Sequence, residues 1–272
     1  MIFPPPIQDR IDAIRGSRTS GAAELTAQAA DVLSLAAELA PDSIPDAARL
    51  LVAAQPAMAP LVNLTRFVLA ATDPGAAARE FLLRMRAAAP RVAGHAARFI
   101  LDGCAVLTHS YSSTVFEAFL AARQRGRHFH VICTESRPLC EGAALAASLG
   151  REGIEVTLIL DAAIASFLPR VALVLVGADA VSSRGLVNKT GTALLALAAS
   201  RFQVPMYALC GSEKFLPPDY ELRPEPPKDP REILAHPPPN VTVVNYYFDL
   251  TPLEYLAGIV TEDGVTSPPP GP

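Results

Sequence analysis

The stretch VALVLVGADAVSSRGLVNKTGT, from Val171 to Thr192, decides the fold. It begins with the apolar run 171–176, which is too short for a helix and is rich in the β-branched residues of a strand buried on both faces. Gly177 allows a tight turn, and Asp179 follows just past the strand end. Residues 188–192, NKTGT, are then expected to open the next helix. The pattern places a carboxylate at a strand end and a lysine at a helix N-terminus, where open α/β sheets bind small anions.

The rest of the chain shows two kinds of pattern. After a proline-rich lead-in at 1–9, Ala/Leu stretches at helical spacing fill the first hundred residues, and strand–helix alternation follows. This predicts an α/β protein in which an N-terminal helical part, 1–100, precedes an α/β part, 101–272. We expect helices near 22–40, 46–54, 60–71, 75–88 and 91–99, and strands at 104–108, 129–133, 156–160, 171–176 and 204–210.

The C-terminal third is interrupted by a stretch that has no apolar period. Residues 217–240 are rich in proline and charge, and we expect them to form a long surface loop. Residues 241–244, VTVV, are expected to form a last short strand, and 251–262 a short helix or extended element. Residues 267–272 read as a disordered tail.

Composition excludes several classes of protein. Half of the 272 residues are apolar and the formal net charge is −4, so the chain is globular, and no Lys/Arg run indicates direct binding of nucleic acid. No signal peptide and no apolar run of membrane-spanning length is visible, which predicts a cytoplasmic protein without membrane contact. The four cysteines lack zinc-finger spacing and are expected to be reduced, buried thiols.

Polar side chains follow the predicted strands, and strand ends of a parallel sheet meet at one edge. Lysines, an arginine and helix N-termini there suit a phosphate group, and an aspartate can move a proton or bind sugar hydroxyls. There is no G-x-G-x-x-G and no P-loop, which argues against dinucleotide and ATPase sites, and no metal or cofactor is expected. The side chains are His109, Ser110, Ser112, Glu135, Arg137, Asp161, Asp179, Asn188, Lys189, Glu213 and Lys214.

Each of these residues also has a structural interpretation. Asp179 can cap a turn and Asn188 a helix, Arg137 can be a solvated charge, and His109 can be a packed core histidine. A lysine at a helix start opposes the helix dipole, so Lys189 requires an anionic neighbour or ligand. Further upstream, the segment 16–21 is either an ordinary helix–helix turn or an anion-binding nest beside Arg15.

Several of these turns together resemble one family, the translation initiation factor 2B alpha/beta/delta superfamily. That family includes methylthioribose-1-phosphate isomerase and ribose-1,5-bisphosphate isomerase. The resemblance spans nearly the whole chain in the family's order. The segments that carry it are 14–15 with 20–23, LTHSYS at 107–112, TESRP at 134–138, Gly142, Asp161, VGAD at 176–179, Gly185, NKTGT at 188–192, 214–215, FDLTP at 248–252 and 261–262.

The resemblance implies a Rossmann-like C-terminal domain, a homodimer built through it, and a ligand pocket between the two domains. The isomerases of the family use an aspartate, matched here by Asp179, and a cysteine after the histidine of T-H-C, where this chain has Ser110. A serine hydroxyl is far less acidic than a thiol and needs its own activation. A second departure is Gln55, which stands where the bisphosphate isomerases carry an arginine before proline.

Two functions follow as hypotheses. In the first, the cleft binds a phosphorylated sugar or nucleotide, with isomerase activity of the ribose-1-phosphate type. In the second, the protein is a non-catalytic regulatory or assembly protein like the initiation factor subunits. The retained Asp179 favours catalytic activity, and the missing thiol favours ligand binding without conversion. For the first hypothesis we expect Asp179 and Ser110 as catalytic residues. The expected ligand-binding residues are Arg15, Gly21, His109, Ser112, Arg137, Asn188, Lys189 and Lys214.

Overall fold

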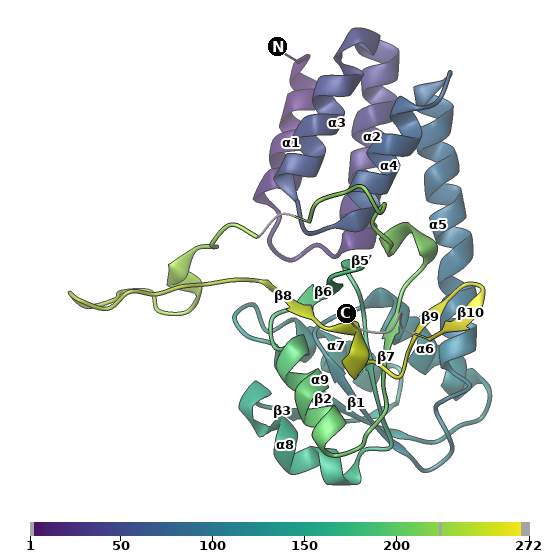
Figure 1. Cartoon of the computed structure of the whole chain (residues 1–272), viewed down its shortest axis with the longest axis vertical. Helices are drawn as coiled ribbons and strands as arrows, with labels where there is room; N and C mark the ends of the chain where they lie inside the picture. The colour runs from purple at the N-terminus through teal and green to yellow at the C-terminus, as the bar shows by residue number, and fades with distance from the viewer. Residues whose placement is uncertain (1–2, 223–224, 268–272) are drawn as a thin grey trace.

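The computed structural model describes residues 3–222 and 225–267 and confirms an α/β protein with an N-terminal helical part. Figure 1 shows this part standing on one end of the sheet part. Apart from Ser267, the tail expected at 267–272 lies outside the described residues. Among the described residues, no helix is long and apolar enough to span a membrane. The helical part consists of α1 (Pro5–Gly16), α2 (Ala22–Leu39), α3 (Ile44–Ala54), α4 (Ala59–Leu69) and α5 (Pro74–Ala96).

The first helix, α1, includes part of the segment 1–9 that was predicted to be a proline-rich lead-in. It begins at Pro5, because a proline in the first turn has a suitable φ and its missing N–H is not needed there. Ile7, Ile11 and Ile14 then lie on one buried face of α1 and pack into the core of the helical part.

The helix α5 joins the two parts of the molecule. Two helices were expected, at 75–88 and 91–99, but one helix continues through Pro90. Its first half packs in the helical core, and its second half, which includes the fully buried Val92, packs against the sheet. This burial outweighs the hydrogen bond that proline removes. Because α5 belongs to both cores, a domain boundary at residue 100 stays a prediction.

The second part is built on a seven-stranded sheet in the order β10-β9-β7-β4-β1-β2-β3, parallel except for β10. Helices α5, α6 and α7 cover one face, and α8 and α9 cover the other. The five strands expected from the sequence are present within two residues of their predicted ends. The elements are β1 (Ala105–His109), α6 (Ser113–Gln124), β2 (His130–Thr134), α7 (Glu141–Arg151), β3 (Glu155–Ile159), α8 (Ile164–Phe167), β4 (Leu173–Val176), α9 (Thr192–Arg201), β7 (Met206–Leu209), β9 (Gly258–Thr261) and β10 (Gly264–Thr266).

A small antiparallel sheet lies beside the large one, and the strands in this region differ from two of the expectations. It consists of β5 (Ala180–Ser182), β6 (Gly185–Lys189) and β8 (Phe248–Thr251). Residues 188 and 189 therefore end a strand instead of opening a helix, because they pair with Asp249 and Phe248 of β8. The last stretch of chain adds strands at β8, β9 and β10, whereas 241–244 is not a strand.

The long segment before β8 runs over the surface. In its described part it contains one short 3₁₀ turn, Pro230–Glu232, and no α-helix or strand. Figure 1 shows that residues beyond this turn project far from the body of the molecule.

Candidate functional site

A cleft of about 600 Å³ lies between the helical part and the carboxyl ends of β1, β4 and β7. This volume is in the range of small-molecule sites. The helical part contributes residues 17–25 to its wall, and the strand ends contribute 110–114, 177–179 and the turn after β7. Further lining residues include Gln55, Met58, Met85, Arg86, Glu141, Asn188, Lys189, Lys214, Tyr247 and Phe248.

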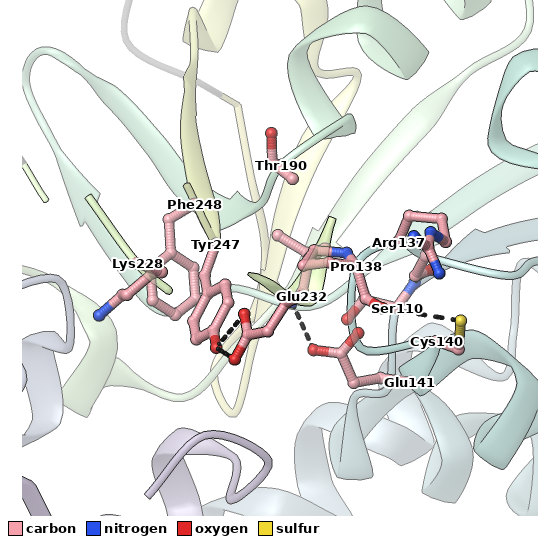
Figure 2. A network of polar contacts seen from close by, with 12 residues as sticks. Ser110, Arg137, Pro138, Cys140, Glu141, Thr190, Lys228, Glu232, Tyr247 and Phe248 are labelled. Carbon is pink, nitrogen blue, oxygen red and sulfur yellow. Dashed lines mark hydrogen bonds and ion pairs between the residues drawn. The ribbon is translucent and has the colours of Figure 1, made fainter. Parts of the chain in front are cut away.

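The structure brings most of the predicted site residues to this cleft. His109 lies behind the wall, and Arg15 and Arg137 lie outside it. Arg15 pairs with Asp12 on the outer side of α1. The side chain of Arg137 is exposed beside Pro138 and Cys140, as Figure 2 shows. The residues that line the cleft are Gly21, Ser110, Ser112, Asp179, Asn188, Lys189 and Lys214.

Asp179 is fixed at the end of β4 by its backbone. Its N–H donates to the carbonyl oxygen of Val187 at 2.9 Å, and its own carbonyl accepts from the N–H of Ala59 at 3.0 Å. Its carboxyl group makes no hydrogen bond to a described residue, so it does not cap a turn. Burial raises the pKa of Asp179, although Lys214 and Lys189 act in the opposite direction. A carboxyl group with a raised pKa thus faces the cleft.

Ser110, at the position of the family's cysteine, lies in a turn of unusual geometry. Its φ is +66°, in the left-handed region, and its N–H donates to the Ser136 hydroxyl at 2.7 Å. Ser136 also has a positive φ, and its N–H and that of Arg137 both donate to the Asp161 carboxylate at 2.8 Å. Asp161 therefore caps the turn after β2. Backbone strain of this kind is concentrated at functional sites.

His109 connects three segments and does not reach the cleft. Its Nε2 lies 2.8 Å from the carbonyl oxygen of Thr190, which can only accept, so Nε2 carries the hydrogen. Its Nδ1 then accepts from the Thr134 hydroxyl at 2.6 Å. Burial lowers the pKa of His109 and keeps the ring neutral. A Cβ on Gly191 would lie 3.1 Å from the ring, so this residue must be small. The structure favours the packed-histidine interpretation.

Lys189 is buried in an ion pair that the sequence did not predict. Its ammonium group pairs with the carboxylate of Glu141, from the first turn of α7, and lies 5.0 Å from the centre of the Tyr247 ring. Glu141 Oε2 is buried and has no hydrogen-bond partner among the described residues. Lys189 was expected to require an anionic neighbour, and Glu141 is that neighbour. The lysine, however, lies at the end of a strand and not at the start of a helix. Nothing in the local sequence links residues 141 and 189.

Other polar groups fix the remaining turns around the cleft. Ser112 accepts from the N–H of Val115 and caps α6, and the Asn188 amide donates to the Thr192 hydroxyl at 3.0 Å. Asp249, which was not singled out as a site residue, accepts from the N–H groups of Gly191 and Ala193 at the start of α9. Burial raises its pKa to about 6 in spite of these hydrogen bonds.

The outer side of the cleft is formed by the loop before α2 and by charged side chains. Gly21 precedes this 18-residue helix, whose first turn has no side-chain cap. Arg18 and Arg86 also line the cleft, and sequence reasoning missed both of them. Gln55 is buried and its amide donates to the carbonyl oxygen of Ile14 at 3.0 Å, so it supports this loop. The first turn of α2, which lines the cleft, thus has backbone N–H groups without a side-chain cap, the groups that bind anions at helix N-termini.

Fold and cleft together define an α/β protein with a cleft of small-molecule size between a helical part and the carboxyl ends of a parallel sheet. The model of the Initiation factor 2 subunit family matches residues 12–268, and the chain belongs to this family. It is 36% identical to a Pyrococcus horikoshii protein described as translation initiation factor eIF-2B subunit 2-like, over 98% of this chain and 99% of the relative.

Two further relatives show the breadth of the family. The chain is 33% identical to ribose 1,5-bisphosphate isomerase of Archaeoglobus fulgidus, over 96% of this chain and 90% of that protein. Its fold is similar to the crystal structure of Pyrococcus horikoshii OT3 translation initiation factor eIF-2B, with a TM-score of 0.89, 35% identity and 98% of each chain covered. The family thus contains both a sugar-phosphate isomerase and initiation-factor-like proteins.

Proposed function

We propose that this protein binds a phosphorylated sugar in the cleft and that Asp179 transfers protons in an aldose–ketose isomerisation. The observation that carries the proposal is the carboxyl group of Asp179, which has a raised pKa, makes no hydrogen bond to a described residue and faces a cleft with an uncapped helix N-terminus on its other side. The relationship to ribose 1,5-bisphosphate isomerase supports the same substrate class.

The phosphate group is assigned to the outer side of the cleft. The N–H groups at the start of α2 and the positive end of its dipole favour an anion there. Lys214 and Arg86 line the same cleft and form no ion pair with a described residue. Together these groups are suited to the charge of one phosphate.

The sugar hydroxyls are assigned to the inner side. Glu141 Oε2 lacks a hydrogen-bond partner among the described residues, and Asp179 and Asn188 lie on the same wall. Lys189 is already paired with Glu141, so it offers little charge to a second phosphate. Gln55, which stands in place of an arginine, also offers no positive charge to a second phosphate. Both features favour a sugar monophosphate as the ligand.

The second candidate function is a non-catalytic regulatory or assembly protein, and one observation favours it. Isomerisation needs a group that cooperates with Asp179, and the family's thiol is replaced by the hydroxyl of Ser110. His109 does not activate this hydroxyl, because both of its ring nitrogens are bonded to Thr134 and Thr190. In this case the ligand stabilises the protein without being converted.

A thermal-shift titration combined with product analysis tests both functions. We expect ribose 1-phosphate or another pentose monophosphate to stabilise the protein, by about 2.7 kcal/mol at a hundred times its dissociation constant. Unphosphorylated ribose serves as the control and should give no shift. Proton NMR of the same samples shows whether a ketose phosphate appears. No shift with any phosphate ester contradicts both functions of the cleft, and binding without product supports the second one.

A further inference from the structure

The end of the large sheet opposite the cleft carries an exposed group of arginines. Because β1, β2, β3, β4 and β7 are parallel, the connections that lead into them all lie at this end, which faces away from the helical part (Figure 1). With the helix ends before them, these connections are 97–104, 123–129, 150–155, 168–172 and 200–205, and we call them together the basic edge. Its arginines are all exposed: Arg98, Arg123, Arg125, Arg127, Arg151, Arg170 and Arg201.

The charge of the basic edge is opposite to that of the whole chain. Against its seven arginines stand three acidic residues, Asp102, Glu152 and Glu155, whereas the formal net charge of the chain is −4. Asp102 is further occupied by His128, whose backbone N–H donates to its carboxylate at 2.7 Å. Charge of one sign gathered on one side of a molecule attracts a partner of the opposite sign.

The arginines of the basic edge are not neutralised within the chain. None of them forms an ion pair with a described residue, whereas seven other arginines do, for example Arg66 with Asp219 and Arg91 with Asp263. Arg125 donates to the carbonyl oxygen of Gly94 at 2.9 Å, but a guanidinium group has five N–H donors. The basic edge therefore keeps donors and charge for an anion from outside.

The helix dipole explains only part of this pattern. Basic residues stabilise the last turn of a helix, and Arg123, Arg151 and Arg201 occupy such positions in α6, α7 and α9. Arg98 and Arg127 lie outside the helices. Their side chains make no hydrogen bond or ion pair to the described part of the chain, so nothing in the fold requires a cation at these two positions.

The basic edge forms a row and not a single pocket. In the strand order β7-β4-β1-β2-β3, each of the five strands is preceded by at least one of the arginines. Neighbouring strands are about 4.8 Å apart, so the row is about 20 Å long. This length matches the phosphates of roughly six base pairs of a duplex. Guanidinium groups also bind phosphate oxygens through two parallel hydrogen bonds.

We propose that the basic edge binds the sugar-phosphate backbone of a nucleic acid without reading its sequence. A row of arginines favours a polymer with regularly spaced phosphates over one small anion, and phosphate contacts carry no base information. The sequence shows no Lys/Arg run because five separate connections supply the residues, and only the fold brings them together. The cleft lies at the other end of the strands, so this binding does not depend on the proposed ligand.

Fluorescence anisotropy of the full chain with labelled RNA and DNA duplexes tests the proposal. We expect a dissociation constant of about 10⁻⁴ to 10⁻⁶ M near physiological salt, as for other sequence-independent binding. The affinity should fall about a hundredfold between roughly 50 and 200 mM salt, because four or so phosphate contacts release their counterions. A similar affinity for duplexes of unrelated sequence is part of the expectation.

Charge reversal at the basic edge should remove the binding. Arg123→Glu/Arg125→Glu/Arg127→Glu is expected to weaken it at least about tenfold and to reduce its salt dependence. Arg125 also bonds to Gly94, so this variant is checked by its melting temperature. Arg98→Glu/Arg127→Glu breaks no hydrogen bond to a described residue and should weaken binding at least about fivefold, which keeps the test decisive if the triple variant unfolds.

A matched control separates the basic edge from the overall charge. Arg10→Glu/Arg79→Glu/Arg184→Glu changes the net charge as much as the triple edge variant, at three exposed arginines that also lack an ion pair with a described residue. It should bind within about threefold of the wild type. Polyglutamate and phosphatidylserine vesicles serve as other polyanions. No binding at low salt, an equal loss in the edge and control variants, or equally tight binding of polyglutamate or vesicles overturns the proposal.

Discussion

The two sides of the cleft are built in opposite ways. The outer side, which we call the rim, consists of the loop 17–22 together with Lys214 and Arg86. The charges of Lys214 and Arg86 are at least partly exposed and form no ion pair with a described residue, whereas Arg18 of the loop pairs with Glu232. The inner side, the floor, consists of Asp179, Lys189 and Glu141. Lys189 and Glu141 form a buried ion pair, and burial raises the pKa of Asp179. The rim is therefore suited to attract an anion, and the floor to orient uncharged groups and move protons.

This contrast has a structural origin. The floor residues lie at the ends of strands or in the first turn of a helix, where sheet pairing fixes the backbone. The rim is mostly loop and the ends of side chains, and these adapt to a ligand. Changes in the floor should thus affect chemistry and stability, and changes in the rim should affect affinity.

The largest expected effect is on turnover. Asp179→Asn should lower the rate of ketose formation by about a hundredfold or more and change ligand affinity only a few-fold. The reason is that an amide has nearly the shape of the carboxyl group but cannot give or take up its proton. Glu213→Gln is the matched control, since burial also raises the pKa of this cleft-lining acid. Product analysis by NMR measures the rates. Equal turnover in Asp179→Asn and wild type would reject Asp179 as the proton carrier.

The next effect concerns the stability of the floor. Lys189→Met leaves the Glu141 carboxylate buried without a cation and should cost about 3–5 kcal/mol of unfolding free energy. Adding Glu141→Gln should recover much of this loss. Urea denaturation measures both. As a control, Arg66→Met breaks an exposed pair with Asp219 and should cost less than about 1 kcal/mol. A similar cost in the single and double variants would show that the unpaired Glu141 carboxylate is not the cause of the loss.

The smallest effect concerns the rim. Lys214→Ala should weaken binding of a pentose phosphate about tenfold, because one charged hydrogen-bond donor is lost. Arg15→Ala should leave the affinity within a factor of two, since Arg15 pairs with Asp12 outside the cleft. Isothermal titration calorimetry measures both. If Arg15→Ala weakens binding as much as Lys214→Ala, the phosphate does not bind at the rim as described.

The sequence predicts the fold well where the signal is local. Five strands and the polar turns after them follow from short apolar runs, so Asp179 and Lys214 could be placed at one edge of the sheet. The strand at residues 185–189 could not be predicted, because it depends on β8, which lies about sixty residues further along the chain. The pairing of Lys189 with Glu141 is non-local for the same reason.

Arg15 and Arg18 show how helix phase decides a site residue. The isoleucines of α1 fix which side of that helix is buried, and Arg15 lies on the opposite, exposed side. Arg18 lies after the helix, in the loop that lines the cleft, where the backbone has turned. Two arginines three residues apart therefore have different surroundings, and their order in the sequence does not reveal this.

The bonds of His109 have a mechanical consequence. The ring of His109 at the end of β1 hydrogen-bonds to Thr134 at the end of β2 and to Thr190 in the connection to α9, so it holds these three segments together. Gly191 packs so closely against the ring that a side chain there would not fit. Ser110 and Asn188 are thereby held as parts of one block. We therefore expect any widening of the cleft that admits a ligand to come from movement of the helical part, while the turns that His109 connects keep their positions.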